Sequence, residues 1–133
     1  KFNKNYFDEN FFLYFEEIDL CRRVIKNKGK IYLDNNILIK HEGASSVNKK
    51  NSFELEKIRN WHWMWSTFYF HKKHKGIIMS FIITFPKLLK ALIKSTIYFL
   101  ILNKKKRDIY LCRLSGIFNS MMGKKSWYRS TLD

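Results

Sequence analysis

Cysteine is scarce in this chain of 133 residues, in which only Cys21 and Cys112 occur. The two thiols lie far apart in the sequence, and neither has a second cysteine nearby. This spacing argues against a disulfide framework and against a cysteine-based zinc site. A reducing, cytoplasmic setting fits this composition best, with each thiol explained as a small apolar group.

The chain also lacks signals of secretion and of repeat architecture. After Lys1 there is no charged segment followed by a short apolar run and a small-residue cleavage site, so no secretory signal is recognised at this end. No internal repeat or low-complexity segment occurs. The apolar content of 46% is ordinary for a globular protein, and the length suffices for one modest domain or for part of a larger one.

Acidic residues are nearly absent from the second half of the chain. Residues 1–56 contain ten Lys/Arg and nine Asp/Glu, for a net charge of +1, whereas residues 57–133 contain sixteen and two, for +14. A surface with this excess of positive charge attracts polyanions. Both a nucleic acid and an anionic lipid surface meet that description.

Hydrophobic spacing predicts helices over residues 16–28, 52–74 and 109–122. The first helix is expected to end at Gly29, in the left-handed conformation that is typical of helix C-termini. Gly123 is expected to end the last helix in the same way.

Two short strands are expected between the first two helices. Residues 30–33 and 36–40 are β-branched and aromatic runs on either side of an Asp-Asn-Asn turn signal. The pattern therefore predicts strand, turn and strand.

Residues 77–102 form the most apolar window of the chain. Their length would span a bilayer, but Pro86 interrupts them and lysines recur on one helical face. A helix with one polar face and one apolar face is expected to lie in a membrane interface. The alternative is a core helix whose lysines form a solvated stripe. The residues expected to contact the membrane are those lysines and the basic run that follows: Lys87, Lys90, Lys94, Lys104, Lys105, Lys106 and Arg107.

Three carboxylates follow an aromatic run in the stretch FFLYFEEIDLCRR, which extends from Phe11 to Arg23. Glu16, Glu17 and Asp19 would fall in the first turn of the predicted helix. Acids are stabilised there by unpaired backbone N–H groups and by the helix dipole. The residues alone leave both this structural role and a catalytic role open.

Residues 6–46, YFDENFFLYFEEIDLCRRVIKNKGKIYLDNNILIKHEGASS, closely resemble the C-terminal part of the catalytic domain in bacterial family-two glycosyltransferases. The resemblance is to rhamnosyltransferase-like members, which build cell-surface polysaccharides. The resemblance is carried by five features that follow one another along the chain. They are Phe-Asp-Glu, the aromatic run with its acid pair, Asp-Leu-Cys-Arg, a helix end with lysine and glycine, and the final His-Glu-Gly-Ala-Ser. The resemblance implies an α/β fold of the GT-A, Rossmann-like type for residues 1–75. Residues 76–133 would follow as a mostly helical, basic and amphipathic tail, peripheral to a membrane.

The resemblance also implies a role for each matching residue. Glu17 would be the general base that takes the proton of the acceptor hydroxyl, and Glu16 would be its partner in the acid pair. His41 would ligate a divalent cation or contact the diphosphate. The positions that would orient the substrates or close over them are Asp19, Arg22, Tyr14, Gly43, Ser45 and Ser46.

The implied reaction is the inverting transfer of a sugar, with rhamnose as the family-level expectation, from a nucleoside-diphosphate sugar to a hydroxyl of a lipid-linked polysaccharide precursor. The family's Asp-x-Asp motif is absent. The donor-binding half and the other ligands of a Mn²⁺ or Mg²⁺ ion are therefore expected upstream, and these residues alone are expected to be inactive.

The expected location is the cytoplasmic face of the plasma membrane, with an anionic membrane surface as a partner and no nucleic acid. The rival interpretation is a basic membrane-surface or nucleic-acid-binding module without catalysis.

Overall fold

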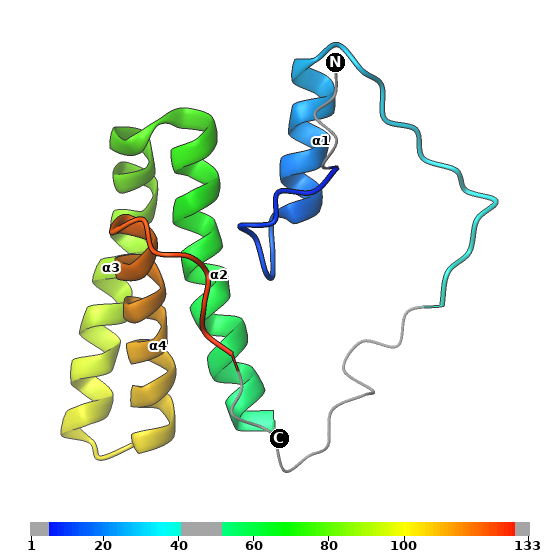
Figure 1. Cartoon of the computed structure of the whole chain (residues 1–133). Helices are drawn as coiled ribbons and strands as arrows, with labels where there is room; N and C mark the ends of the chain where they lie inside the picture. The colour runs from blue at the N-terminus through cyan, green and yellow to red at the C-terminus, as the bar shows by residue number, and fades with distance from the viewer. Residues whose placement is uncertain (1–5, 41–51, 130–133) are drawn as a thin grey trace.

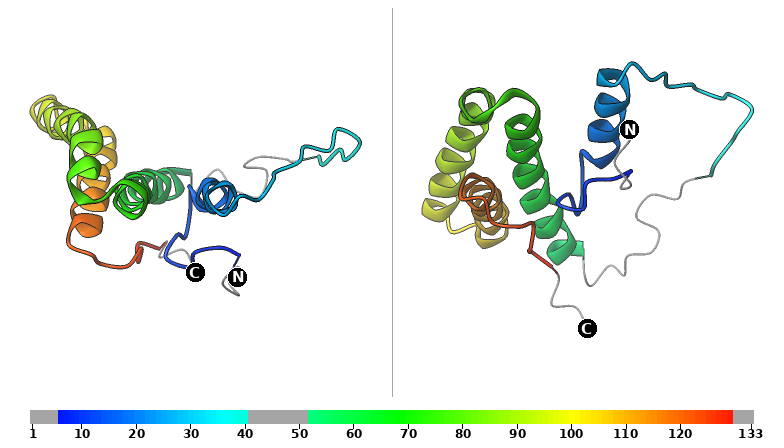
Figure 2. Two further views of the ribbon diagram at one scale, coloured as in Figure 1. Left: turned by 90° about the horizontal axis from the view of Figure 1, so that it is seen from above. Right: turned by 45° about the horizontal axis from the view of Figure 1, so that its top comes forward.

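The computed structural model describes residues 6–40 and 52–129, and within these ranges the chain forms four helices and no strand. Their bounds are α1 Glu16–Lys26, α2 Ser52–Lys75, α3 Ile77–Leu100 and α4 Lys104–Met121. Helices α2, α3 and α4 pack together, and α1 lies beside α2 on the side away from α3 and α4 (Figures 1 and 2).

The expected α/β fold is wrong for the described residues, which are all helical or irregular. Residues 30–40, where two strands were predicted, are exposed and extend away from the helices (Figure 1). A strand requires a neighbour that pairs its N–H and C=O groups, and no described segment provides one. The turn between them does form, since Asp34 Oδ1 accepts the N–H of Asn36 at 2.9 Å.

Helix α2 is the centre of the fold because its middle packs against α4 and the segment after α4, and also against the loop before α1. The indole Nε1 of Trp61 donates to Ser115 Oγ of α4 at 3.1 Å, and that of Trp65 donates to the carbonyl of Lys124 at 3.0 Å. A helix that is apolar around its whole circumference is stable only when it is buried. The buried residues of α2 are Ile58, Trp61, His62, Met64, Trp65, Ser66, Thr67, Phe68 and Phe70.

The helix ends follow the predicted chemistry with one exception. Gly123 has φ 72° and the N–H of Lys124 reaches the carbonyl of Asn119 at 2.9 Å, which confirms the predicted end of α4. At the end of α1, however, Lys28 adopts the left-handed conformation, with φ 59°. Gly29 instead allows a close approach, since a Cβ there would lie 2.7 Å from Cγ1 of Val24.

Gly116 sets how closely α4 approaches α2. A Cβ at this buried position would lie 2.3 Å from the carbonyl oxygen of Trp61. Only glycine lets the two backbones meet at this distance.

We predict that Gly116→Ala lowers the free energy of unfolding by about 2 kcal/mol, because the added methyl group pushes α4 off α2. The measurement is urea unfolding followed by tryptophan fluorescence. Gly123→Ala is the matched control: its Cβ meets nothing within 4 Å, so only its φ of 72° opposes the change, at a cost of about 1 kcal/mol. Equal losses in the two variants would show that the close approach does not limit packing.

Candidate functional site

An aromatic loop before α1 packs lengthwise against α2. Phe11 is buried and its ring meets Tyr69 edge-on at 5.0 Å between centroids. Phe15 lies 5.0 Å from Phe70, and Ser66 Oγ of α2 donates to the carbonyl of Leu13 at 2.8 Å. These contacts attach the aromatic loop to α2.

The turn into α1 has an unusual backbone. Tyr14 and Phe15 have φ values of 69° and 73°, so two consecutive residues with large side chains are left-handed. Each such residue costs of order 1–3 kcal/mol and persists only where the surroundings impose it. Tyr14 is held edge-on against Trp63 at 5.2 Å, and Phe15 lies between Trp63 and Phe70. The helix therefore begins at Glu16 directly after a strained turn.

The two predicted catalytic carboxylates occupy the first turn of α1. Glu17 is exposed and makes no hydrogen bond or ion pair with any residue that the structure describes. Glu16 is half-buried, and its Oε2 atom is buried without a hydrogen-bond partner. No side chain caps the start of α1, so both carboxylates lie near unpaired backbone N–H groups.

Asp19, predicted to bind substrate, instead connects α1 to α2. Its side chain is 0% exposed. Its carboxylate meets Lys73 Nζ at 2.8 Å, His74 Nε2 at 2.7 Å and Arg23 Nε at 2.8 Å. Burial acts to raise the pKa of Asp19, but the hydrogen bonds from these three partners outweigh it, so its pKa lies below the usual range. We name Asp19, Lys73, His74 and Arg23 the ionic cluster.

Asp8 extends this cluster toward the aromatic loop. Its Oδ2 atom accepts Lys73 Nζ at 2.7 Å and the hydroxyl of Tyr69 at 3.1 Å. Burial opposes ionisation of Asp8, but the hydrogen bonds of Lys73 and Asn10 lower its pKa to about 2. Burial, together with the nearby Asp8 charge, raises the pKa of Tyr69 to about 12. Both groups thus keep one protonation state through the neutral range.

A polar cavity of about 640 Å³ lies beside the ionic cluster, within the range typical of small-ligand sites. Asp8 and Lys73 form an ion pair with each other, whereas Lys125 makes no hydrogen bond or ion pair within the described part of the chain. Arg129 lies over the ring of Phe12 at 3.5 Å. Such a mixture of hydroxyl, amide and cationic groups suits a ligand that carries both hydroxyl groups and phosphate. The lining residues are Phe7, Asp8, Glu9, Asn10, Arg23, Lys73, Lys125, Ser126 and Arg129.

The remaining predicted substrate and metal residues are only partly described. Arg22 is exposed, with its guanidinium 5.8 Å from the ring of Phe70. The loop residues His41, Gly43, Ser45 and Ser46 lie outside the described residues. Among residues 6–40 and 52–129, no group of three or more His, Cys, Asp and Glu side chains could hold a metal ion.

The predicted membrane-contacting cations fall into two groups. Lys87 is half-buried, and this burial lowers its pKa, while Lys94 Nζ lies 5.9 Å from the ring centroids of both Tyr98 and Tyr110. Arg107 donates two hydrogen bonds to Asp108. The exposed group consists of Lys90, Lys104, Lys105 and Lys106. Within the described ranges, no helix combines the length and the apolarity needed to cross a membrane.

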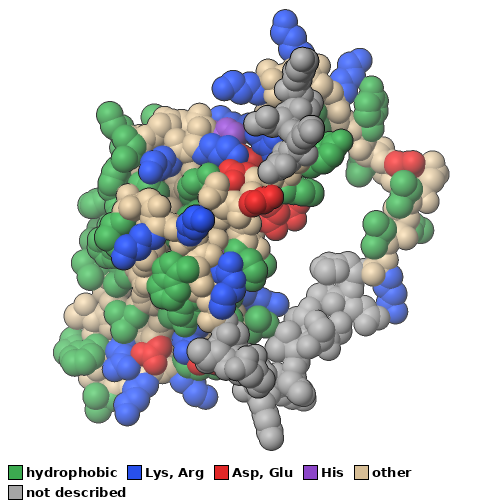
Figure 3. Space-filling view, viewed as in Figure 1, with side chains coloured by type: hydrophobic (Ala, Val, Ile, Leu, Met, Phe, Trp, Pro, Cys, Tyr) green, Lys and Arg blue, Asp and Glu red, His purple; other side chains and the backbone are tan. Residues whose placement is uncertain are grey.

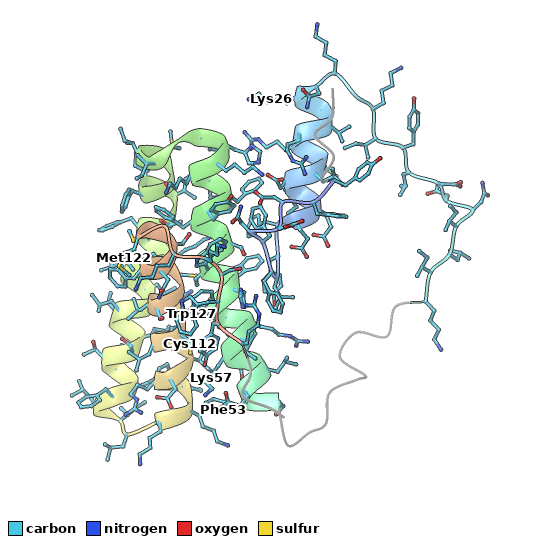
Figure 4. The ribbon with its side chains drawn as sticks, viewed as in Figure 1. Lys26, Phe53, Lys57, Cys112, Met122 and Trp127 are labelled. Carbon is cyan, nitrogen blue, oxygen red and sulfur yellow. The ribbon has the colours of Figure 1, made fainter. Side chains whose placement is uncertain are left out.

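The environment of Cys112 does not favour a nucleophilic thiolate. Cys112 lies where α4 faces the first half of α2, near Lys57 (Figure 4). Burial raises the pKa of this thiol, so it stays protonated at neutral pH, and a thiol is a much weaker nucleophile than a thiolate.

We predict that Asp19→Asn releases α1 from α2, because Lys73 and Arg23 lose their shared counter-charge. The loss should be about 2 kcal/mol, less than for a fully buried pair, since the Lys73 and Arg23 side chains are 27% and 23% exposed. Hydrogen exchange should show faster exchange in residues 16–26 and unchanged protection in α2 and α4. Asp34→Asn, in the exposed turn, is the control, and unaltered exchange in α1 of Asp19→Asn would contradict the role of the ionic cluster.

No protein-family model, no curated protein and no solved structure matches this chain. The resemblance to family-two glycosyltransferases therefore depends on the order of the residues quoted above. Of that segment, the structure describes residues 6–40.

Proposed function

We propose that this chain supplies the acceptor side of an inverting glycosyl transfer reaction, with Glu17 as the general base. The observation that carries this proposal is the pair of left-handed residues, Tyr14 and Phe15, directly before Glu16 and Glu17. The segment is also the one in which the resemblance to glycosyltransferases is densest.

The strained turn has a chemical rationale in this proposal. Strained backbone conformations concentrate at active sites, where the strain fixes the direction of a reacting group. A relaxed helix start would have a Ser, Thr, Asp or Asn cap in an extended conformation, whereas α1 begins with no side-chain cap. Aromatic contacts with α2 hold the turn and leave the Glu17 carboxylate open to solvent and to a substrate.

The proposed step moves one proton and one glycosyl group. The acceptor hydroxyl oxygen attacks the anomeric carbon of the donor sugar, the bond from that carbon to the nucleoside diphosphate breaks, and the hydroxyl proton passes to Glu17. The diphosphate departs from the opposite face of the sugar, so the configuration inverts. In this proposal, residues outside those described bind the nucleotide sugar. The described residues contain no group of three or more His, Cys, Asp and Glu side chains that could hold a metal ion. We therefore assign no step to a metal here.

The polar cavity supports a phosphate-bearing acceptor. Lys125 and Arg129 add positive charge to the cavity beyond the cations that pair with Asp8 and Asp19. Hydroxyl, amide and carboxylate groups in the same lining suit the sugar portion of such a molecule. A lipid-linked saccharide carries both features.

We predict that Glu17→Gln in an active protein containing these residues lowers kcat by about 100-fold or more and changes KM little, because the amide cannot accept the proton. The measurement is sugar transfer from a nucleoside-diphosphate sugar to a lipid-linked acceptor, with each variant's melting temperature compared with that of the wild type.

Glu56→Gln is the matched control, since it makes the same change at an exposed acid on α2. Its turnover should equal that of the wild type. A Glu17→Gln protein that folds normally and retains wild-type kcat would remove Glu17 from the mechanism.

A further inference from the structure

In helix α3 the buried residues are small and the large apolar residues are exposed, which is the reverse of a helix in a typical water-soluble domain. The buried residues of α3 are all small, and each is at most 6% exposed: Ser80, Thr84, Ala91 and Ser95. The hydroxyls of these residues bond back to the helix itself, as in Thr84 Oγ1 to the carbonyl of Ser80 at 2.7 Å. A soluble helix normally buries its large apolar residues instead.

The large apolar residues of α3 point outward. They recur at helical spacing along its length, with exposed fractions of 75% for Ile78, 61% for Ile82, 60% for Phe85, 45% for Leu89, 52% for Leu92 and 72% for Leu100. Figure 3 shows apolar side chains gathered along the edge of the molecule formed by α3. We name these six residues the apolar face. With a rise of 1.5 Å per residue, it extends over about 35 Å, and exposed apolar surfaces of this size mark interaction sites.

Charge identifies the kind of partner. No Asp or Glu occurs between Glu56 and Asp108. Lys90, Lys104, Lys105 and Lys106 are exposed, three of them in the first turn of α4, directly after α3 ends. A partner must therefore combine an apolar interior with a negatively charged rim. An anionic bilayer has both.

The other candidate partners fit less well. A nucleic acid would satisfy the lysines but would leave the apolar face in water. A second copy of the chain would cover the apolar face but would bring together two molecules of net charge +15, which repel each other.

We propose that the apolar face lies in the interface of an anionic membrane, with the axis of α3 along the membrane surface. Phe85 and Leu89, near the middle of the helix, enter the acyl-chain boundary, and Lys90 and Lys104–Lys106 meet the lipid phosphates. Lys87 and Lys94 do not act in this binding because they face α2 and α4. The binding needs no catalysis and is thus independent of the proposed glycosyl transfer.

The test is cosedimentation of the whole chain with vesicles at low salt. The wild type should bind vesicles of equimolar phosphatidylcholine and phosphatidylglycerol and should bind phosphatidylcholine vesicles much more weakly. The double variant Phe85→Glu, Leu89→Glu should bind at least about tenfold more weakly, because at each position an apolar side chain is no longer buried in lipid. The double variant Lys104→Ala, Lys105→Ala should lose roughly fivefold per lysine, and the loss should shrink as salt rises.

The matched control for the apolar face is Leu33→Glu, Leu38→Glu. It makes the same kind of change at residues that are 89% and 93% exposed and lie outside α3. Its affinity for anionic vesicles should be within twofold of the wild-type affinity, which corresponds to about 0.4 kcal/mol. Circular dichroism melting checks that each variant is folded; all of the replaced side chains are exposed.

Three results would overturn the proposal. The first is no binding of the wild type to anionic vesicles at low salt. The second is equal binding by Phe85→Glu, Leu89→Glu and by its control, which would leave charge as the only attraction. The third is a stable dimer of the wild type that this variant dissociates while vesicle binding is absent, which would make the apolar face an interface between copies.

Discussion

The burial of the middle of α2 on two opposite sides holds the described part of this protein together. On one side, the indole of Trp61 donates to Ser115 of α4, and the backbone of Trp61 approaches Gly116 so closely that only a glycine fits there. On the other side, Ser66 and Phe70 hold the aromatic loop that leads into α1. Because one rigid helix contacts both, the position of α1 relative to α3 and α4 is set through α2.

The attachment of α1 differs in kind from the packing of the other helices. Its apolar residues Ile18 and Ile25 are 53% and 64% exposed, so hydrophobic burial contributes little to its position. The ionic cluster and the aromatic loop hold it instead. Elements with few buried apolar contacts open locally at low free energy, which is consistent with the proposed role of the carboxylates of α1.

Local sequence patterns were sufficient to predict most helices and their ends. The spacing of apolar residues located α1 and α2 to within two residues at their ends, and Gly123 located the end of α4. The start of α4 was missed because Lys104–Arg107 place positive charge in a first turn, against the helix dipole. There Asn103 Oδ1 accepts the N–H of Lys106 at 3.1 Å and provides the cap.

Features that depend on distant partners could not be predicted from such patterns. The runs at 30–33 and 36–40 have strand-like composition but no described neighbour to pair with. Asp19 was expected in the first turn of its helix, and nothing in its own segment indicates Lys73 and His74, which α2 brings to it. The contacts of the aromatic run with Tyr69 and Phe70 of α2 likewise became clear only from the packing.

The two proposals together constrain the acceptor. The apolar face of α3 is exposed. Helix α1 lies on the side of α2 that is opposite α3 (Figure 2). Neighbouring helix axes are 8–10 Å apart, so Glu17 would stand about 20 Å from a membrane that touches α3. The reacting hydroxyl must then belong to a sugar some distance from the lipid, at the outer end of a short saccharide, because the first sugar beside the diphosphate would not reach it. Equal transfer rates to acceptors with one sugar and with three would contradict this joint placement of α1 and α3.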